Sequence, residues 1–249
     1  LERSGLVFSG SVKTELWAGP AQLATLYTNL HGWVSTDEAE IRGVTVNRAF
    51  ASLEFDGHRL NLGKLEADIG RESERGPLNG TFTFDLRDRA YTWRGQTHFA
   101  PPAVFPVMPP RLLRACRPFR FLQEPPDMVW DLRGRLGDPE ATVVHAQGEG
   151  GRLVYQGSYV DKFGFGLDLS DGVLTLDPLR VESGGGVAEG KVRVDFENKM
   201  CSFDARSTVP PKLLAPMIRP VVERIVRPFR FEGPTEVTAR GTVDYGRHA

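Results

Sequence analysis

One segment of the chain occurs twice, and this repeat constrains the fold more than any other feature of the sequence. Residues 80–121 align with residues 190–231 at a constant separation of 110, and 11 of the 42 aligned pairs are identical. Both segments end in the pentapeptide RPFRF. Upstream, residues 39–69 align with 153–183 at a separation of 114, so the first copy has four additional residues, which we place in the polar stretch 70–77. Such a repeat predicts an array of similar units.

The repeat divides the chain at two points. We expect a partial preceding repeat over residues 1–38, a first complete repeat over 39–138 and a second over 139–249. No linker composition separates the two complete copies, because apolar residues such as Trp130 and Leu132 lead directly toward the second copy. A sheet that continues from copy to copy is therefore expected.

Within each copy the dominant hydrophobic period is two. Phe163, Phe165 and Leu167 alternate with glycine residues, which is typical of β-strands with one apolar face. Turn sequences such as Asp171-Gly172 separate successive runs. We therefore predict antiparallel strands that are apolar on one face and charged on the other. The residues predicted to line the apolar face are Phe82, Phe84, Trp93, Phe99, Phe163, Phe165, Leu167, Leu174, Leu176, Val192, Val194, Phe196 and Phe203.

Two proline-containing segments depart from the period of two. Residues 211–227 carry apolar residues at helical spacing, and Pro216 and Pro220 are expected to bend this helix. The equivalent helix of the first copy is shorter, near residues 111–117. Because the long helix lies between strands, packing on the sheet, as a lid or otherwise, is favoured over lying on a membrane surface. The predicted lid residues are Leu213, Leu214, Met217, Ile218, Val221, Val222 and Ile225.

The apolar face of the predicted sheet needs a cover. A helix of ~17 residues is about 25 Å long, so it can cover only part of a sheet whose strands lie about 4.8 Å apart. The remaining cover is either a second sheet or something that is not protein. The predicted apolar set is therefore either the lining of a groove or an ordinary closed core.

Charge balance and the absence of known motifs argue against several classes of function. Thirty-one Lys and Arg against 32 Asp and Glu leave a net charge of −1, so we expect no nucleic-acid partner. The five histidines have no ligand spacing, and no nucleophile or phosphate-loop motif occurs. We therefore expect neither an enzyme nor a metal or other cofactor. Cys116 and Cys201 either pair or remain buried thiols.

No apolar run approaches the roughly 20 residues that cross a bilayer. The chain begins with Leu1 rather than Met. We therefore expect a piece of a longer protein, with any membrane anchor or export signal outside this chain.

The segment DGVLTLDPLRVESGGGVAEGKVRVDF, residues 171–196, resembles the C-terminal repeat pattern of the AsmA-like family. In that pattern a short strand after an Asp-Gly turn is followed by a second strand, a Gly-rich joint and a Gly-x-x-x-Val-Asp strand. The first copy repeats it less faithfully, and the likeness covers most of residues 39–245. The resemblance implies a mainly β fold: a continuous, curled antiparallel sheet, or repeating β-groove, with short amphipathic helices between repeats.

The same resemblance implies a function and a location. AsmA-like proteins are anchored in the inner membrane of Gram-negative-type bacteria and reach into the periplasm. The chain is then a periplasmic segment that shields phospholipid acyl chains in a hydrophobic groove and supports lipid transport between the inner and outer membranes. The implied partners are phospholipid or another acyl-chain lipid, and the membrane through a part of the parent protein outside this chain.

Two other functions stay open. A structural or adhesive β-sandwich repeat, binding a protein or glycan partner, would enclose the apolar residues in separate cores. A β-rich enzyme acting on carbohydrate would need an inward cluster of polar and acidic side chains, and the sequence offers none.

Overall fold

The computed structural model describes residues 8–18, 30–107, 113, 117–122, 124–213 and 236–246. Almost all regular structure in these residues is extended, as the period of two predicts. The strands are β1 (Phe8–Ala18), β2 (Leu30–Ile41), β3 (Val44–Phe55), β4 (Arg59–Ile69), β5 (Gly76–Asp85), β6 (Ala90–Thr97), β7 (Phe119–Phe121), β8 (Asp127–Arg135), β9 (Asp138–Gly150), β10 (Leu153–Tyr155), β11 (Ser158–Val160), β12 (Lys162–Ser170), β13 (Val173–Ser183), β14 (Gly186–Asp195), β15 (Met200–Ser207) and β16 (Val237–Asp244).

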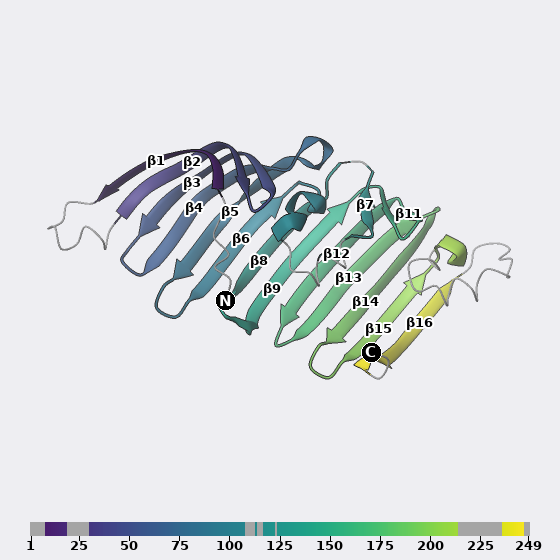
Figure 1. The fold of residues 1–249 in the computed structure, drawn as a ribbon. Coiled ribbons are helices and arrows are strands. Elements are labelled where there is room, and N and C mark those ends of the chain that lie inside the picture. Colours follow the sequence, from purple (N-terminus) through teal and green to yellow (C-terminus); the bar gives the residue numbers. More distant parts are fainter. Residues whose placement is uncertain are drawn as a thin grey trace. The chain divides into compact units, whose positions relative to one another are not determined.

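The strands of the main sheet follow the order of the chain. Neighbours are joined by backbone hydrogen bonds in the order β1-β2-β3-β4-β5-β6-β8-β9-β12-β13-β14-β15-β16, and β11-β10-β7 form a separate small sheet. The registered strand pairs are antiparallel. Because the order is linear, with β1 and β16 at its ends, the sheet is open (Figure 1). The predicted mainly β, antiparallel fold is confirmed.

The chain divides into two compact units within β9. Residues 1–113 and 127–142 belong to the first unit, and residues 114–126 and 143–249 belong to the second. Equivalent strands occur in both. The strands β4, β5 and β6 of the first copy correspond to β13, β14 and β15 of the second, and the two members of each pair have the same length. The additional residues of the first copy form the connection from β4 to β5, which contains the 3-10 helix η2 (Glu72–Glu74).

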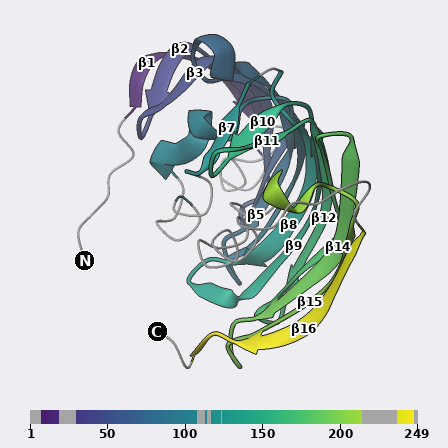
Figure 2. The ribbon, with the colours of Figure 1, turned by 90° about the vertical axis from the view of Figure 1, so that its right-hand side faces the viewer.

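The first unit has its core at one end of its strands. A second 3-10 helix, η3 (Pro101–Val107), follows β6 and lies on one side of the strands (Figure 2). Val44, Ile69, Leu78, Phe99 and Ala103 form the buried cluster there. η3 therefore covers only part of the apolar face.

The second unit has a small cover of its own. The three-stranded sheet β11-β10-β7 lies next to β13, where the Ser183 hydroxyl donates to the Tyr159 carbonyl at 2.6 Å. Leu153 and Val160 of this small sheet are buried. Phe121 of β7 meets Phe163 of β12, with ring centroids 6.2 Å apart.

The predicted long helices fall largely outside the described residues. Residues 211–213 form a helical turn, in which the Leu213 N–H donates to the Pro210 carbonyl at 2.8 Å. Residues 214–227 lie outside the described part of the chain, and of the shorter helix near 111–117 only Leu113 and Arg117 lie inside it. Among the described residues, no helical segment is longer than η3.

Candidate functional site

The apolar face of the second unit is built from strands β12 to β15. Cross-strand register places Leu167 opposite Leu176, and Val192 opposite Phe203. Because side chains at alternate positions share a face, the predicted lining residues of these strands lie on one face. All of them are half-buried: Phe163, Phe165, Leu167, Leu174, Leu176, Val192, Val194 and Phe203.

The first unit repeats this arrangement on β5 and β6. Phe82 lies opposite Trp93, and Phe84 opposite Tyr91. All four side chains are half-buried. The Trp93 ring makes an edge-on contact with Trp130 of β8, with ring centroids 5.4 Å apart.

Two predicted lining residues lie elsewhere. Phe99 follows β6 and is 5% exposed, because it packs in the cluster beside η3. It is a core residue rather than part of an open face. Phe196 stands just beyond the end of β14, where its N–H donates to the Gly172 carbonyl, and it is 53% exposed. Its side chain is therefore at the hairpin end of the face.

Sequence reasoning missed other residues of the same face, because β-bulges shift the alternation. The register of β13 against β14 shifts between Leu176 and Leu179. After the shift, Leu179 pairs with Gly190 and Val181 with Ala188. The apolar face of β13 is therefore formed by even-numbered residues before the bulge and by odd-numbered residues after it. A strict period of two predicts the opposite face for Leu179 and Val181. Residues 173–183 carry apolar side chains at both even and odd positions. This was the feature of the sequence that could have indicated a bulge within the strand.

Glycines face several of the aromatic rings. A Cβ atom built on Gly150 would lie 2.5 Å from the Phe163 ring, and one built on Gly241 would lie 3.0 Å from the Phe203 ring. Each glycine is the direct partner of its phenylalanine in the register. The rings therefore lie over the neighbouring strand rather than standing upright from the sheet.

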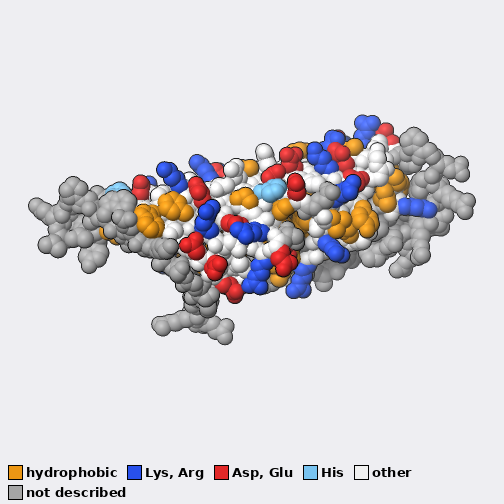
Figure 3. Space-filling model, turned by 90° about the horizontal axis from the view of Figure 1, so that it is seen from above, with side chains coloured by type: hydrophobic (Ala, Val, Ile, Leu, Met, Phe, Trp, Pro, Cys, Tyr) orange, Lys and Arg blue, Asp and Glu red, His pale blue; other side chains and the backbone are white. Residues whose placement is uncertain are grey.

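The opposite face is polar. Ion pairs join neighbouring strands there, including Arg94 with Asp131 at 2.8 Å and Lys191 with Asp177 at 2.8 Å. Arg240 of β16 also pairs with Asp204 of β15. Charges of both signs are interspersed over the surface seen in Figure 3. Such exposed ion pairs contribute little to the free energy of unfolding. Their charges keep this face of the sheet hydrated.

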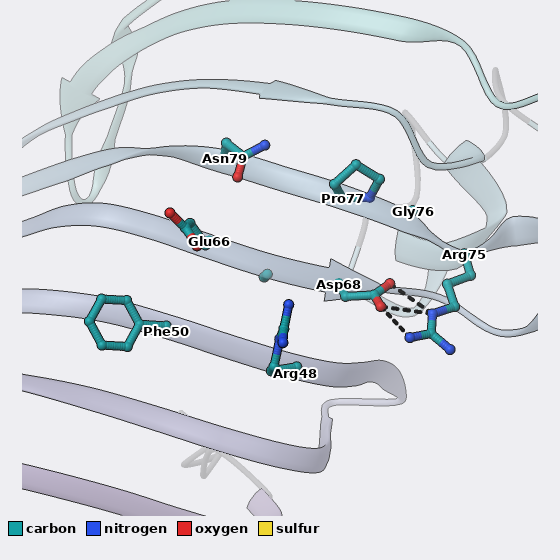
Figure 4. A pocket seen from close by; sticks show the side chains of 9 residues that line it. Arg48, Phe50, Glu66, Asp68, Arg75, Gly76, Pro77 and Asn79 are labelled. Atoms are coloured by element: carbon teal, nitrogen blue, oxygen red, sulfur yellow. Dashed lines mark hydrogen bonds and ion pairs between the residues drawn. The ribbon is translucent and has the colours of Figure 1, made fainter.

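A cavity of about 430 Å³ opens on the polar side of β3, β4 and β5 (Figure 4). Arg75 holds Asp68 there through its Nε, at 2.8 and 2.9 Å from the two carboxylate oxygens. Arg48, Phe50 and Glu66 also line the cavity. The Phe50 ring stacks on Trp33 with centroids 6.3 Å apart.

Hydrogen bonds lower the pKa of several aspartates at the hairpin turns. Asn198 donates its side-chain amide to Asp195 at 3.0 Å and its backbone N–H at 2.9 Å, and these bonds lower the pKa of Asp195. At the equivalent turn of the first copy, the Arg87 N–H donates to Asp85 at 2.9 Å and lowers the pKa of Asp85. Both carboxylates therefore stabilise their turns by accepting backbone hydrogen bonds.

The other predicted features have the following positions. Of the predicted lid residues, only Leu213 lies within the described residues, where a Cβ on Gly184 would stand 2.5 Å from its Cδ1. Leu214, Met217, Ile218, Val221, Val222 and Ile225 lie outside them. Cys201 is a free, half-buried thiol on β15, and Cys116 lies outside the described residues.

No cluster of three or more His, Cys, Asp or Glu side chains is arranged for a metal ion in the part of the chain that the structure describes. Within those same ranges, no helix has the length and apolar character needed to span a membrane.

Comparison with known proteins gives no match of any kind. No family model, no curated protein sequence and no solved structure matches this chain.

Proposed function

We propose that the chain is a segment of an AsmA-like periplasmic protein, anchored in the inner membrane through a part of the parent protein outside this chain. Its apolar face shields phospholipid acyl chains and supports lipid transport between the inner and outer membranes. The finer features of the fold, a sheet curled into a groove and amphipathic helices between repeats, belong to the same proposal. Shielding acyl chains needs no cofactor and no chemical step, because contact with an apolar surface is enough to keep them from water.

The observation that carries this proposal is the incomplete cover of the apolar face. Phe165, Val192 and Phe203 stay half-buried although their strands lie inside the sheet order. In the described residues, only the small sheet β11-β10-β7 and the short helical segments lie apart from the main sheet. A contiguous apolar surface of this kind in a soluble protein is typical of a binding surface.

Acyl chains suit such a surface energetically. Each CH₂ group moved from water to an apolar surface gains ~0.8 kcal/mol, so ten buried groups would contribute about 8 kcal/mol before the costs of ordering are subtracted. The predicted lining positions carry aromatic rings and branched aliphatic side chains, and none of them is charged. A flexible hydrocarbon chain can follow such a surface without needing fixed polar contacts.

The test is direct detection of bound lipid. The whole chain is produced in the periplasm of a Gram-negative bacterium, purified without detergent and extracted with organic solvent, and the extract is analysed by mass spectrometry. We expect phospholipid to co-purify in a constant molar ratio. Lipid-free protein that is fully folded would contradict the proposal.

A charge placed on the face sharpens the test. Phe203→Asp and Phe165→Asp should each lower the bound lipid at least tenfold, while circular dichroism and thermal unfolding stay close to those of the wild type. Ser202→Asp is the matched control, because Ser202 is the neighbour of Phe203 on β15 and faces the polar side. If the two phenylalanine variants unfold while Ser202→Asp stays folded, the phenylalanines belong to a closed core, as the β-sandwich alternative requires.

A further inference from the structure

The cavity on the polar side of β3, β4 and β5 is built around an exposed aromatic ring. The cross-strand register places Phe50 of β3 opposite Glu66 of β4, and Glu66 opposite Asn79 of β5 (Figure 4). These side chains therefore stand on three successive strands, across about 10 Å of the sheet. Phe50 is 37% exposed and stacks on Trp33 of β2. Its ring therefore offers an apolar surface on an otherwise charged face.

The polar side chains beside this ring have no partner within the protein. Among the described residues, Arg48, Glu66 and Asn79 take part in no side-chain hydrogen bond or ion pair. Asp68 lies directly opposite Arg48 in the register, but Arg75 holds its carboxylate. A guanidinium only donates hydrogen bonds, a carboxylate only accepts them, and an amide does both. The cavity therefore presents unused donors and acceptors next to the ring.

The second copy of the repeat lacks this arrangement, although its strands keep the same register. Gly164 stands at the position that is equivalent to Phe50. Arg180 stands at the position that is equivalent to Glu66, and Glu189 of the neighbouring strand pairs with it. The equivalent place in the second unit therefore has no aromatic ring, and its charges are engaged with one another.

One wall of the cavity comes from the polar stretch 70–77, in which the first copy has its four additional residues. Arg75 and Pro77 of this stretch line the cavity, and the Arg75 guanidinium fixes Asp68 in place. The ring, the free carboxylate and this wall are thus specific to the first copy. The strand framework that the two copies share does not require them, so a function of their own is favoured.

The charges of the cavity balance, which bears on the class of ligand. Arg48 is offset by Glu66, and Arg75 is engaged by Asp68. No surplus of either sign favours an anion or a cation. A matching ligand has apolar C–H groups for the ring and neutral hydroxyl groups for the polar side chains. Because the face of an aromatic ring is electron-rich, it attracts the weakly positive C–H groups of a sugar ring.

We propose that this cavity of the first unit binds a neutral oligosaccharide. One sugar ring would lie with its C–H groups on Phe50, while its hydroxyl groups donate to Glu66 and accept from Arg48 and Asn79. The cavity volume of about 430 Å³ falls within the range of roughly 300–1,000 Å³ that is usual for small-molecule sites. The inference concerns the polar face of the sheet, and it holds whether or not the apolar face binds lipid.

The experiment uses the whole chain and three neutral probes: maltotetraose, cellotetraose and tetra-N-acetylchitotetraose. Saturation-transfer difference NMR identifies the probes that bind, and titration gives their dissociation constants. Phe50→Ala removes the stacking surface and should weaken binding at least tenfold. Glu66→Gln replaces a charged acceptor with a neutral one and should weaken binding about fivefold. Val129→Ala is the matched control, because Val129 is an exposed residue of β8 in the same cross-strand row as Asn79 but outside the cavity.

Binding of at least one neutral tetrasaccharide, weakened by both cavity variants and unchanged in Val129→Ala, supports the site. The proposal is overturned if none of the three probes binds at millimolar concentration, or if Phe50→Ala binds as the wild type does. Tighter binding of an acidic oligogalacturonate or of a cationic chitosan tetramer than of every neutral probe also overturns it. If Phe50→Ala does not fold, Glu66→Gln decides the test, because it changes one exposed side chain and keeps its shape.

Discussion

The Phe163 ring of β12 lies across Gly150 of β9, so closely that a Cβ atom on the glycine would stand 2.5 Å from it. The two residues are direct partners in the antiparallel register. Phe121 of β7 contacts the same ring from the small sheet. Because Gly150 has no side chain, the Phe163 ring can pack on β9 and also contact the small sheet that partly covers this face.

This contact makes position 150 intolerant of even a methyl group. Gly150→Ala should destabilise the second unit by about 1–3 kcal/mol, because the Phe163 ring must move out of its packed position. Gly164→Ala is the control, since its nearest non-neighbouring atom would be the Gly148 carbonyl oxygen at 3.8 Å. Urea unfolding followed by circular dichroism measures both, and equal stability of the two variants would contradict the proposed packing.

Val209 is the most completely enclosed apolar side chain among the described residues, with no exposed surface, and its N–H donates to the Ser207 hydroxyl at 3.1 Å. Val209→Ala should lower the free energy of unfolding by about 1–3 kcal/mol through lost burial and a small cavity. Val237→Ala removes the same atoms from a residue that is 41% exposed. The exposed substitution should change the midpoint of denaturant unfolding much less, and similar effects at both positions would refute this assignment.

The buried Ser183 hydroxyl links β13 to the small sheet by its bond to the Tyr159 carbonyl. Ser183→Ala should cost about 1–3 kcal/mol, because it leaves a carbonyl oxygen without this donor. Ser170→Ala, at the exposed end of β12, serves as the control. Hydrogen exchange should show the loss of protection centred on β11, and unchanged protection there would argue against the link.

The turn carboxylates predict an acid-sensitive component of stability. The Asn198 bonds lower the pKa of Asp195 in the folded state. A depressed folded-state pKa stabilises the fold above the unfolded value of about 3.9, and this contribution is lost as the pH falls through the folded-state pKa. Asp195→Asn should therefore flatten the decline of stability between neutral and acidic pH. Urea unfolding at a series of pH values measures it, and an unchanged slope in Asp195→Asn would contradict the prediction.

Local sequence information was sufficient for the main alternating strands of the two complete copies, but not for the segment before residue 33 or for every side-chain direction. The alternation around Phe165 and Val192 predicts the strands and the face on which these residues lie. The same rule fails after Leu176, where a bulge returns Leu179 to the apolar face. A bulge depends on hydrogen bonding with the neighbouring strand, so a period read along a single strand does not locate it.

The sequence by itself determined a repeated, antiparallel, two-faced β structure, because periodicity and turn residues act between close neighbours in the chain. Only the tertiary structure decided which parts of the apolar face are covered. Phe99 is buried because η3 folds back beside it, and Phe163 is partly covered because β7 pairs with β10, a strand distant from it in the chain. Such contacts depend on the free energy of packing distant segments together, which no local pattern encodes.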